Sequence, residues 1–401
     1  MKIIVAPQSF KGSLSAKEAA IIISQSVSEI FPEAEIVQIP IADGGDGTLE
    51  TIIDAADGQI KTTNVTGPLN DNINAPWGLF ESADSKKTAI IEMARSSGLA
   101  LLDPEKLNPY LATTYGTGEL ILEAINSGCN KIILGIGGSA TNDCGVGLAN
   151  ALGIKFNDIN GNEVIHDVKK FIDIALIDLS NINPKLKDIK FEVACDVTNK
   201  LCGKEGASYI YGPQKGASKN DIKILDKNLS HLGEIISNQL NIDVLNINGG
   251  GAAGGLGAGM VAFFNATLKP GVEIIFDSLN VEERIQKSDL IITGEGQFDI
   301  SSTFNKAPTA IAKLGKKYNI PTIGISGSLG EGFEKLDEFG ILSKTTLINK
   351  ISSLEDNINN AKKLLKIASM EQLKAVKIGM NLWVHMTLQL LVAVQLVSAQ
   401  Y

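Results

Sequence analysis

The sequence predicts an α/β protein built on a doubly wound parallel sheet, with a second α/β domain inserted into it. Short apolar runs alternate with segments whose apolar residues recur at helical spacing, which is typical of βαβ units and a parallel sheet. Glycine-rich or polar clusters follow directly after these runs, where ligands bind in open α/β sheets. A chain of 401 residues is also too long for one ordinary domain, so we expect two.

The first sixty residues contain a complete βαβ unit. Residues 2–6 form an apolar run that ends at a proline, as expected of a short buried strand. Ser15 and Glu18 match a capping box, in which a hydroxyl and a carboxylate satisfy exposed amides at a helix start. Apolar residues then recur at helical spacing as far as Ile30, and residues 36–39 are the next expected strand.

Similar units recur further along the chain. Strands are expected at 132–136, 191–195, 290–293 and 321–325, and a helix from about Pro308. The first of these strands leads into "GGSATND" and the second into "DVTN".

The segment 61–92 differs, because its runs resemble antiparallel strands. We therefore expect a discontinuous doubly wound domain formed by 1–60 and 271–380. The inserted α/β domain is expected at 61–270, and residues 381–401 form an uncharged apolar tail.

This tail lacks Asp, Glu, Lys and Arg from Ile378 onward. A membrane span needs about 20 predominantly apolar residues, and here the apolar run is interrupted by Asn381, His385, Gln389 and Gln395. We favour a C-terminal packing or interface helix. A non-native or poorly folded extension ranks second, and a span last.

Composition limits the classes of partner. The formal net charge is −9, which argues against nucleic acid or an anionic membrane surface but leaves anionic small molecules open. Four cysteines without a CxxC pair fit a reducing cytoplasm. The chain has only three histidines, so catalysis by histidine or a histidine-rich metal site is not expected.

The polar clusters indicate a phosphate-bearing substrate. They are "APQSFKGS", "PIADGGDGT", "GIGGSATND", "ACDVTNKLCG" and "ITGEGQFD". Glycines let a ligand approach the backbone, and amides at helix starts attract anions. Carboxylates at the same edge would repel a phosphate unless Mg²⁺ lay between them. The clusters therefore suggest a metal–phosphate substrate.

Two glycine-rich stretches have alternative interpretations. "GIGGSA" at 135–140 fits a dinucleotide fingerprint and equally a tight strand-to-helix turn. "GGGAAGGLGAG" at 249–259 is either a close-packed helix start or an anion cradle. No G-x-x-x-x-G-K-[ST] occurs, which disfavours a phosphate-loop NTPase.

A carboxylate is the expected general base, because histidine is scarce. Asp196, at the end of a buried strand, is the first candidate, and a helix N-cap or Asx turn is its structural alternative. Asp43 is the second, either as base or through Mg²⁺. Three lysines in glycine- or proline-containing loops are candidate cations for phosphate or carboxylate: Lys11, Lys215 and Lys306. Lys11 is also a catalytic candidate.

Seven motifs occur in the order found in the bacterial glycerate kinase family. They are "SFKGSLSA", "PIADGGDGT", "TTYGTGELI", "GIGGSATND", "CDVTN…GA…YGPQKGA", "GGGAAGGLGAG" and "ITGEGQFD…KAP". The chain resembles this family over about residues 1–380. The resemblance implies a Rossmann-like domain plus a second α/β domain, with the active site in the cleft between them. It also implies phosphorylation of D-glycerate by ATP and Mg²⁺, with 2-phosphoglycerate favoured over 3-phosphoglycerate.

The matching motifs supply the remaining site candidates. Substrate or nucleotide binding is expected of Ser9, Gly44, Gly45, Thr117, Gly138, Ser139, Thr141, Asn142, Lys215, Gly294, Glu295 and Lys306, and Mg²⁺ binding of Asp43 and Asp299. The chain departs from the family pattern at Gln8, Asp46, Lys200, Gln297, Ser301 and Asn305.

The two acids of "ADGGDG" are expected to have unequal roles. Asp43 follows the strand directly and can hold a hydroxyl or Mg²⁺. Asp46 precedes the helix of "GTLETIIDAA", where capping and the helix dipole favour an acid.

Two other classes of protein remain open. An NAD-dependent dehydrogenase would use the turn at 135–140, with Asp158 near the distance expected for a ribose ligand, but it lacks an obvious histidine acid–base. A non-catalytic ligand-binding protein is the other. The expected partners are D-glycerate and ATP, with no nucleic acid or membrane, and a homodimer is left open.

Overall fold

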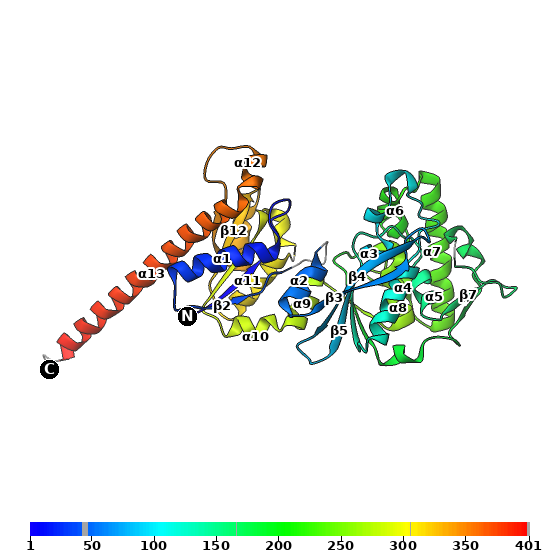
Figure 1. Ribbon diagram of the computed structural model, residues 1–401, viewed down its shortest axis with the longest axis horizontal. Helices are drawn as coiled ribbons and strands as arrows, with labels where there is room; N and C mark the ends of the chain where they lie inside the picture. The colour runs from blue at the N-terminus through cyan, green and yellow to red at the C-terminus, as the bar shows by residue number, and fades with distance from the viewer. Residues whose placement is uncertain (42–46, 166, 305, 399–401) are drawn as a thin grey trace. The chain divides into compact units, whose positions relative to one another are not determined.

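The computed structural model describes residues 1–41, 47–165, 167–304 and 306–398. Its contacts divide the chain into two units (Figure 1). The first combines Met1–Ile41 with Val281–Tyr401, and the second is the continuous segment Ala42–Asn280. Among the described residues, the contacts thus group 47–60 and 271–280 with the second unit, whereas the sequence pattern predicts them in the first.

The first unit contains a parallel sheet of five strands in the order β13-β12-β11-β1-β2. The strands are β1 (Lys2–Pro7), β2 (Glu35–Gln38), β11 (Leu290–Phe298), β12 (Thr322–Leu329) and β13 (Ile341–Thr346). Ile3 of β1 lies opposite Leu290 of β11, so the two ends of the chain meet in the centre of the sheet. The predicted parallel α/β architecture is confirmed for this unit.

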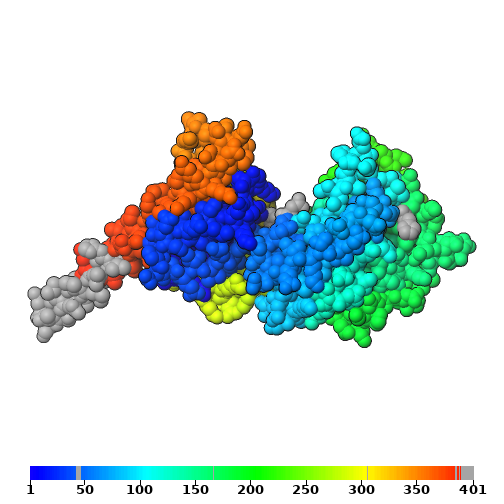
Figure 2. Space-filling view, viewed as in Figure 1, coloured from blue at the N-terminus to red at the C-terminus, as the bar shows by residue number. Residues whose placement is uncertain are grey.

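Helices from both ends of the chain cover this sheet. They are α1 (Ala16–Ile30), α10 (Val281–Gln286), α11 (Ala307–Lys317), α12 (Leu354–Asn359) and α13 (Ala361–Ser398). The predicted capping box of α1 is confirmed, because Ser15 Oγ accepts a hydrogen bond from Glu18 N at 3.2 Å and the Glu18 carboxylate accepts one from Ser15 N at 3.1 Å. Helices α1 and α13 pack side by side over one core (Figure 1). In Figure 2 the blue N-terminal and orange C-terminal segments form one continuous surface.

The second unit is a mixed sheet in the order β10-β9-β6-β5-β4-β3. Its strands are β3 (Gln59–Thr66), β4 (Asn72–Glu81), β5 (Lys87–Glu92), β6 (Lys131–Gly135), β9 (Lys190–Ala194) and β10 (Thr267–Lys269), with a separate antiparallel pair of β7 (Lys155–Asn157) and β8 (Leu176–Asp178). The pairs β3–β4 and β4–β5 are antiparallel, which confirms the prediction for 61–92. The strands β5, β6, β9 and β10 run parallel.

The helices of this unit cover the sheet and complete its core. They are α2 (Thr48–Ala55), α3 (Ala94–Ser97), α4 (Tyr115–Asn126), α5 (Val146–Ala151), α6 (Ala207–Tyr211), α7 (Lys219–Leu240), α8 (Ala252–Phe264) and α9 (Gly271–Leu279). Trp77 and Phe156 are fully buried in this core. Helix α2 packs against β4 and β5, and α9 packs against β9.

The glycine-rich start of α8 is closely packed. Ala253, Gly254 and Gly255 have positive φ values of 54°, 68° and 94°. A Cβ on Gly254 would lie 2.1 Å from the carbonyl oxygen of Thr141, so only glycine fits there. Of the two interpretations of this stretch, close packing is therefore present in the structure.

The C-terminal tail continues α13 as a helix. Within α13, Leu373 is fully buried, whereas Ile378 and Trp383 are 61% and 72% exposed. No helix among the residues described here combines the length and apolarity that a membrane crossing requires.

Candidate active site

The parallel strands of the second unit bring three distant chain segments to one edge. Glu92 at the end of β5 lies opposite Gly135 of β6, and Gly135 lies opposite Ala194 of β9. The loops that follow these residues therefore start side by side, as expected at the carboxyl ends of parallel strands.

These loops form a pocket with a volume of about 190 Å³. Its lining comes from the loop after β6, the end of β9 and the loop after it, the end of α6, the turn Pro213–Lys215 and the start of α8: Ile136, Gly137, Gly138, Ser139, Ala194, Cys195, Asp196, Val197, Tyr211, Gln214, Ala252 and Ala253. The structure thus brings three predicted site residues together, namely Gly138, Ser139 and Asp196. Ala253, in the left-handed region, lies in the same wall, and strained backbone of this kind clusters at functional sites.

Asp196 is exposed on this pocket and is also held by the fold. Its Oδ1 accepts a hydrogen bond of 3.1 Å from the backbone N–H of Gly271, the first residue of α9. This contact is with the start of a helix 75 residues away, and it differs from the local helix N-cap or Asx turn that the sequence leaves as the structural alternative. A carboxylate fixed in this way keeps its place better than one on an unsupported loop.

Two backbone hydrogen bonds hold Ser139 in the wall of the pocket. Leu99 N donates to Gly138 O, and Ala140 N donates to Ser97 O, both at 2.9 Å. Ser139 is 6% exposed, so only a small part of it faces the pocket.

Lys215 lies behind Ser139 and is 1% exposed. It ends a short 3-10 turn, Pro213–Lys215, and its Nζ donates to Ser139 Oγ at 2.8 Å and to the carbonyl oxygen of Thr141 at 2.6 Å. Burial lowers the pKa of Lys215 to about 7.

Next to Lys215, the predicted residues Thr141 and Asn142 are fully buried. Asn142 Nδ2 donates to Ser208 Oγ at 3.2 Å. Thr141 Oγ1 and Asn142 Oδ1 have no hydrogen-bond partner among the residues that the structure describes. Buried polar atoms without partners are uncommon, so these two are candidates for ligand contact.

Asp143 is a buried acid that the sequence analysis did not select. Its carboxylate accepts hydrogen bonds from Thr114 N, Thr114 Oγ1, Gly145 N and Gly147 N at 2.8–3.3 Å. Burial raises its pKa, against the effect of these donors. The only signal for Asp143 in the sequence is an acid inside "GGSATND". Its burial could not be predicted, because its partner Thr114 lies 29 residues away. Thr117 is equally buried, and its hydroxyl contacts those of Ser96 and Ser97 rather than the pocket lining.

A second cluster lies at the end of β5. Arg95 Nε donates to Glu92 Oε2 and Arg95 Nη2 to Glu50 Oε1, both at 2.8 Å. Glu92 Oε1 accepts from Leu49 N at 3.0 Å, so the pair fixes the start of α2. The loop before α2, with Asp43, Gly44, Gly45 and Asp46, lies outside the described residues.

The first unit holds its own group of candidate residues after β11. Glu295 is 6% exposed and accepts a hydrogen bond from Ser302 Oγ at 2.6 Å. Lys306 Nζ lies 3.7 Å from Glu295 Oε2 and donates to Ser301 Oγ at 2.9 Å. Ser301 in turn donates to Asp299 Oδ1, and this bond lowers the pKa of Asp299. Ser301, a departure from the family pattern, thus connects Asp299 to Lys306.

The other candidates of the first unit lie near this group or in the sheet. Gly294 is closely packed, since a Cβ there would lie 2.1 Å from Ile325 O. A Cβ added to Gly296 would lie 3.2 Å from the backbone nitrogen of Lys11, so the Lys11 backbone runs beside β11. The Lys11 side chain is exposed, and Ser9 is half-buried.

No preformed metal cage occurs among the described residues, which contain no group of three or more His, Cys, Asp or Glu side chains suited to a metal ion. The expected ligand Asp299 already accepts hydrogen bonds from the amide and hydroxyl of Ser301. Mg²⁺ is usually held by one or two carboxylates together with substrate phosphates, so Asp299 would form only part of such a site.

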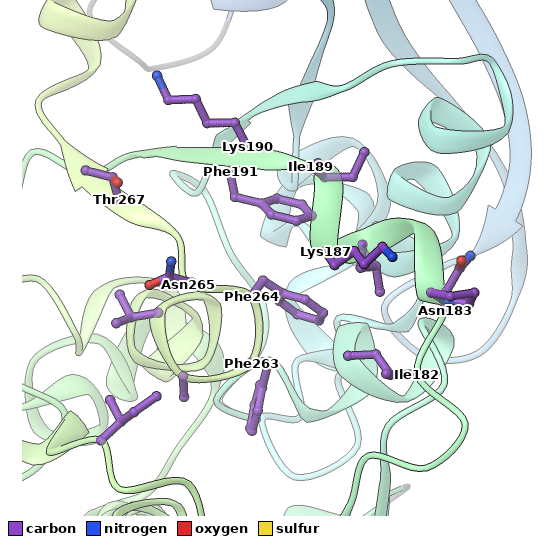
Figure 3. Close-up of a pocket in the computed structure, with 15 residues that line it drawn as sticks. Ile182, Asn183, Lys187, Ile189, Lys190, Phe191, Phe263, Phe264, Asn265 and Thr267 are labelled. Carbon is purple, nitrogen blue, oxygen red and sulfur yellow. The ribbon is translucent and has the colours of Figure 1, made fainter.

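A larger pocket of about 680 Å³ lies at the amino ends of β9 and β10 (Figure 3). Apolar residues dominate it, and the rings of Phe191 and Phe264 lie with centroids 5.5 Å apart. Its lining includes Lys187 and Lys190 but no carboxylate. It therefore lacks the acid–base group that the expected chemistry needs.

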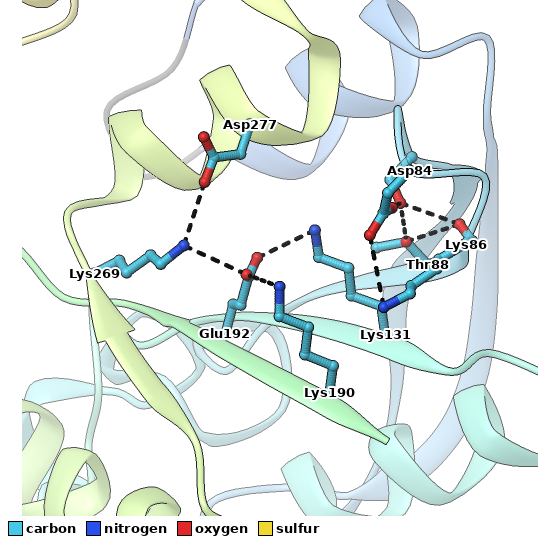
Figure 4. Close-up of polar contacts among 9 residues, drawn as sticks. Asp84, Lys86, Thr88, Lys131, Lys190, Glu192, Lys269 and Asp277 are labelled. Carbon is cyan, nitrogen blue, oxygen red and sulfur yellow. Dashed lines mark hydrogen bonds and ion pairs between the residues drawn. The ribbon is translucent and has the colours of Figure 1, made fainter. Parts of the chain in front are cut away.

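A group of buried charges lies in the sheet of the second unit (Figure 4). Glu192, whose side chain is 1% exposed, is 2.7 Å from Lys190 Nζ, 3.2 Å from Lys131 Nζ and 3.6 Å from Lys269 Nζ. We assign this group to stability, because every member is paired and the side chains of Glu192 and Lys131 are buried.

Comparison with known proteins accounts for this arrangement. The model of the glycerate kinase family matches residues 3–377. The chain is 47% identical to a glycerate 2-kinase of Escherichia coli, covering 95% of this chain and 99% of that protein. It is 44% identical to a glycerate kinase of Halalkalibacterium halodurans, covering 92% and 96%. The crystal structure of a putative glycerate kinase 2 from Salmonella typhimurium superposes with a TM-score of 0.87 at 43% identity, covering 95% and 99%. The chain belongs to the glycerate kinase family.

Proposed function

We propose that this protein transfers the γ-phosphoryl group of ATP to D-glycerate, with 2-phosphoglycerate as the favoured product and 3-phosphoglycerate as the alternative. The observation that carries the proposal is the exposed carboxylate of Asp196, fixed by Gly271 N on a pocket shared with Ser139. Relatives named glycerate 2-kinase and glycerate kinase support the substrate and the position.

In this mechanism Asp196 accepts the proton of the attacking hydroxyl. Phosphoryl transfer depends on positioning and charge stabilisation more than on covalent chemistry. Ser139 is proposed to hydrogen-bond the substrate, because it lines the same pocket and its backbone is fixed on both sides. Asp43 remains the second candidate for the base.

The residues after β11 are proposed to hold the nucleotide. Lys306 supplies a cation, Glu295 is the candidate for the ribose, and Lys11 is a further cation beside the same strand. Mg²⁺ would neutralise the phosphate charge, and Asp299 is its proposed protein ligand in this unit. Asp43 is also proposed as a Mg²⁺ ligand, and it lies outside the described residues.

The dehydrogenase alternative gains no support from the structure. Asp158, its candidate ribose ligand, accepts hydrogen bonds from Asn160 N, Asn162 N and Asn162 Nδ2 within its own turn. These bonds explain its local role without a nucleotide.

A product-resolved assay tests the proposal. Protein shown to be folded is incubated with D-glycerate, ATP and Mg²⁺, and phosphorus NMR identifies the products. We expect a phosphoglycerate that forms only when all three are present, and its resonance distinguishes the two positions. If saturating substrates give no phosphoglycerate, the kinase proposal is wrong.

A further inference from the structure

Lys215 is buried without a carboxylate partner. None of the ion pairs among the described residues includes Lys215, although its side chain is 1% exposed. Burying an unpaired ammonium is costly, so folds retain one mainly where it has a task. The pocket lined by Ser139, to which Lys215 donates a hydrogen bond, is the nearest place for such a task.

The hydrogen bonds of Lys215 determine what Ser139 can offer to a ligand. A charged lysine only donates, so Ser139 Oγ must accept from Lys215 Nζ at 2.8 Å. The hydroxyl hydrogen of Ser139 is then left to donate in another direction, and Ser139 lines the pocket. A neutral Lys215 could instead accept this hydrogen, and the pocket would lose the donor.

The second bond fixes the loop itself. Lys215 Nζ donates to Thr141 O at 2.6 Å, two residues beyond Ser139. Together with the backbone bonds of Gly138 and Ala140, this holds Ser139 from three sides.

An anion in front of Ser139 would lie near the carboxylates of Asp143 and Asp196, so it needs a positive charge close by. Asp143 is the one titratable group, among those described, whose charge acts on Lys215, and it is already saturated with four donors. Asp196 lies on the same pocket, so an anion placed there needs a compensating positive charge. Lys215 provides that charge.

We propose that Lys215 is a positioning residue that acts through Ser139, and that the two together bind an oxyanion of the substrate in this pocket. The oxyanion is either the carboxylate of glycerate or a phosphoryl group, and this choice rests on the proposed function. Lys215 itself does not contact the substrate. Because burial holds its pKa near 7, binding of the oxyanion is accompanied by proton uptake above that pH.

Calorimetric titration of the full chain at pH 8 tests this proposal. The ligands are D-glycerate, inorganic phosphate and a non-hydrolysable ATP analogue, each in two buffers of different ionisation enthalpy. We expect the wild type to take up protons with one of the oxyanions. Lys215→Met and Ser139→Ala should each lower the affinity for that ligand by about 10-fold or more, which is the effect of losing a charge-assisted hydrogen bond.

The pattern of loss identifies the oxyanion. If the two variants lose affinity for D-glycerate alone, the oxyanion is the carboxylate of glycerate. If they lose affinity for phosphate or the ATP analogue, it is a phosphoryl group. Lys219→Met is the matched control, since Lys219 is exposed four residues later, and it should bind as the wild type does.

Two results would overturn the inference. One is unchanged affinity of Ser139→Ala for all three ligands, which decides the question even if Lys215→Met does not fold. The other is wild-type binding without proton uptake. Oxyanion binding that depends on Lys215 in a protein that makes no phosphoglycerate would refute the proposed function and leave this inference standing.

Discussion

Replacing Glu192 with glutamine removes the one carboxylate at which three lysines converge in the second unit. The amide keeps the shape of the side chain, so the change acts mainly through charge. Lys131, whose side chain is 4% exposed, would lose its partner 3.2 Å away. The side chains of Lys190 and Lys269 are 49% and 31% exposed, so water can solvate their ammonium groups when the Glu192 carboxylate is removed.

The expected cost follows from this difference in burial. Removing one member of a buried pair typically destabilises by about 3–5 kcal/mol, and we expect the lower end, about 3 kcal/mol, because only Lys131 is left buried. For a unit of this size that corresponds to a fall in Tm of about 6–12 °C. Lys190→Gln is the matched control and should cost about 0–1 kcal/mol, as exposed pairs do.

Tryptophan fluorescence can follow the second unit separately. The chain has two tryptophans, and Trp77 is fully buried in the core of this unit. In a Trp383→Phe background, Trp77 alone reports the unfolding of its surroundings. Glu192→Gln and Lys190→Gln are compared in that background.

The difference in unfolding free energy between wild type and Glu192→Gln should also depend on pH, which gives a second measurement. Burial raises the pKa of Glu192, but the lysines outweigh it and hold the pKa below its usual range. The stabilising contribution is therefore fully present above the unfolded pKa of about 4.3 and is lost as the pH falls through the folded value. The gap in stability between wild type and Glu192→Gln should narrow on acidification.

A double variant separates charge from packing. Glu192→Leu combined with Lys131→Met replaces the buried pair with apolar side chains, which is often neutral or stabilising. We expect it to be more stable than Glu192→Gln. If Glu192→Gln unfolds at the wild-type temperature, the charges around Glu192 do not contribute to stability as argued.

Three further predictions concern the site and the tail. Asp196→Asn should lower the turnover number by about 100-fold or more with the fold retained, since a positioned base contributes about 10²–10⁴-fold; near-normal turnover would move the base to Asp43. Asp43→Asn should damage catalysis or Mg²⁺ dependence with little change in Tm, whereas Asp46→Asn should be milder because asparagine also caps helices; kinetics and melting curves of both variants decide, and a dead Asp46→Asn beside a silent Asp43→Asn would reverse the roles. Truncation before Asn381 should keep the turnover number while changing solubility or association, because it removes exposed apolar surface; a folded truncation without turnover contradicts this.

Local patterns predicted most of the elements. The alternation of apolar runs and helical periodicity found β1, α1 and β2, and the capping box of α1 is present as predicted. The strand β11 is longer than expected, because "GEGQF" is polar and glycine-rich yet continues to pair with β12. A run without an apolar period gives no local signal for a strand when its pairing comes from a distant segment.

The same limit applies to the site. The sequence predicts that the clusters after the strand ends bind a ligand, and Ser139 and Asp196, from two of these clusters, share a pocket. The burial of Lys215 could not be predicted, because a lysine in a glycine- and proline-containing loop is normally solvated. Thr114 lies 29 residues from its partner Asp143, and Glu50 lies 45 residues from its partner Arg95, so only the packed structure reveals these two contacts.

The position of β1 between β11 and β2 sets the order in which the chain can fold during synthesis. Ile3 pairs with Ile36 of β2 on one side and with Leu290 of β11 on the other, so the first strand leaves the ribosome 287 residues before its partner in β11 exists. At about 5–20 residues per second this interval lasts roughly 14–57 seconds. The second unit is continuous, and all its contacts are available once Asn280 has emerged. We therefore expect the second unit to fold before the first, while the β11 side of the apolar strand 2–7 stays unpaired, as a natural binding site for a chaperone.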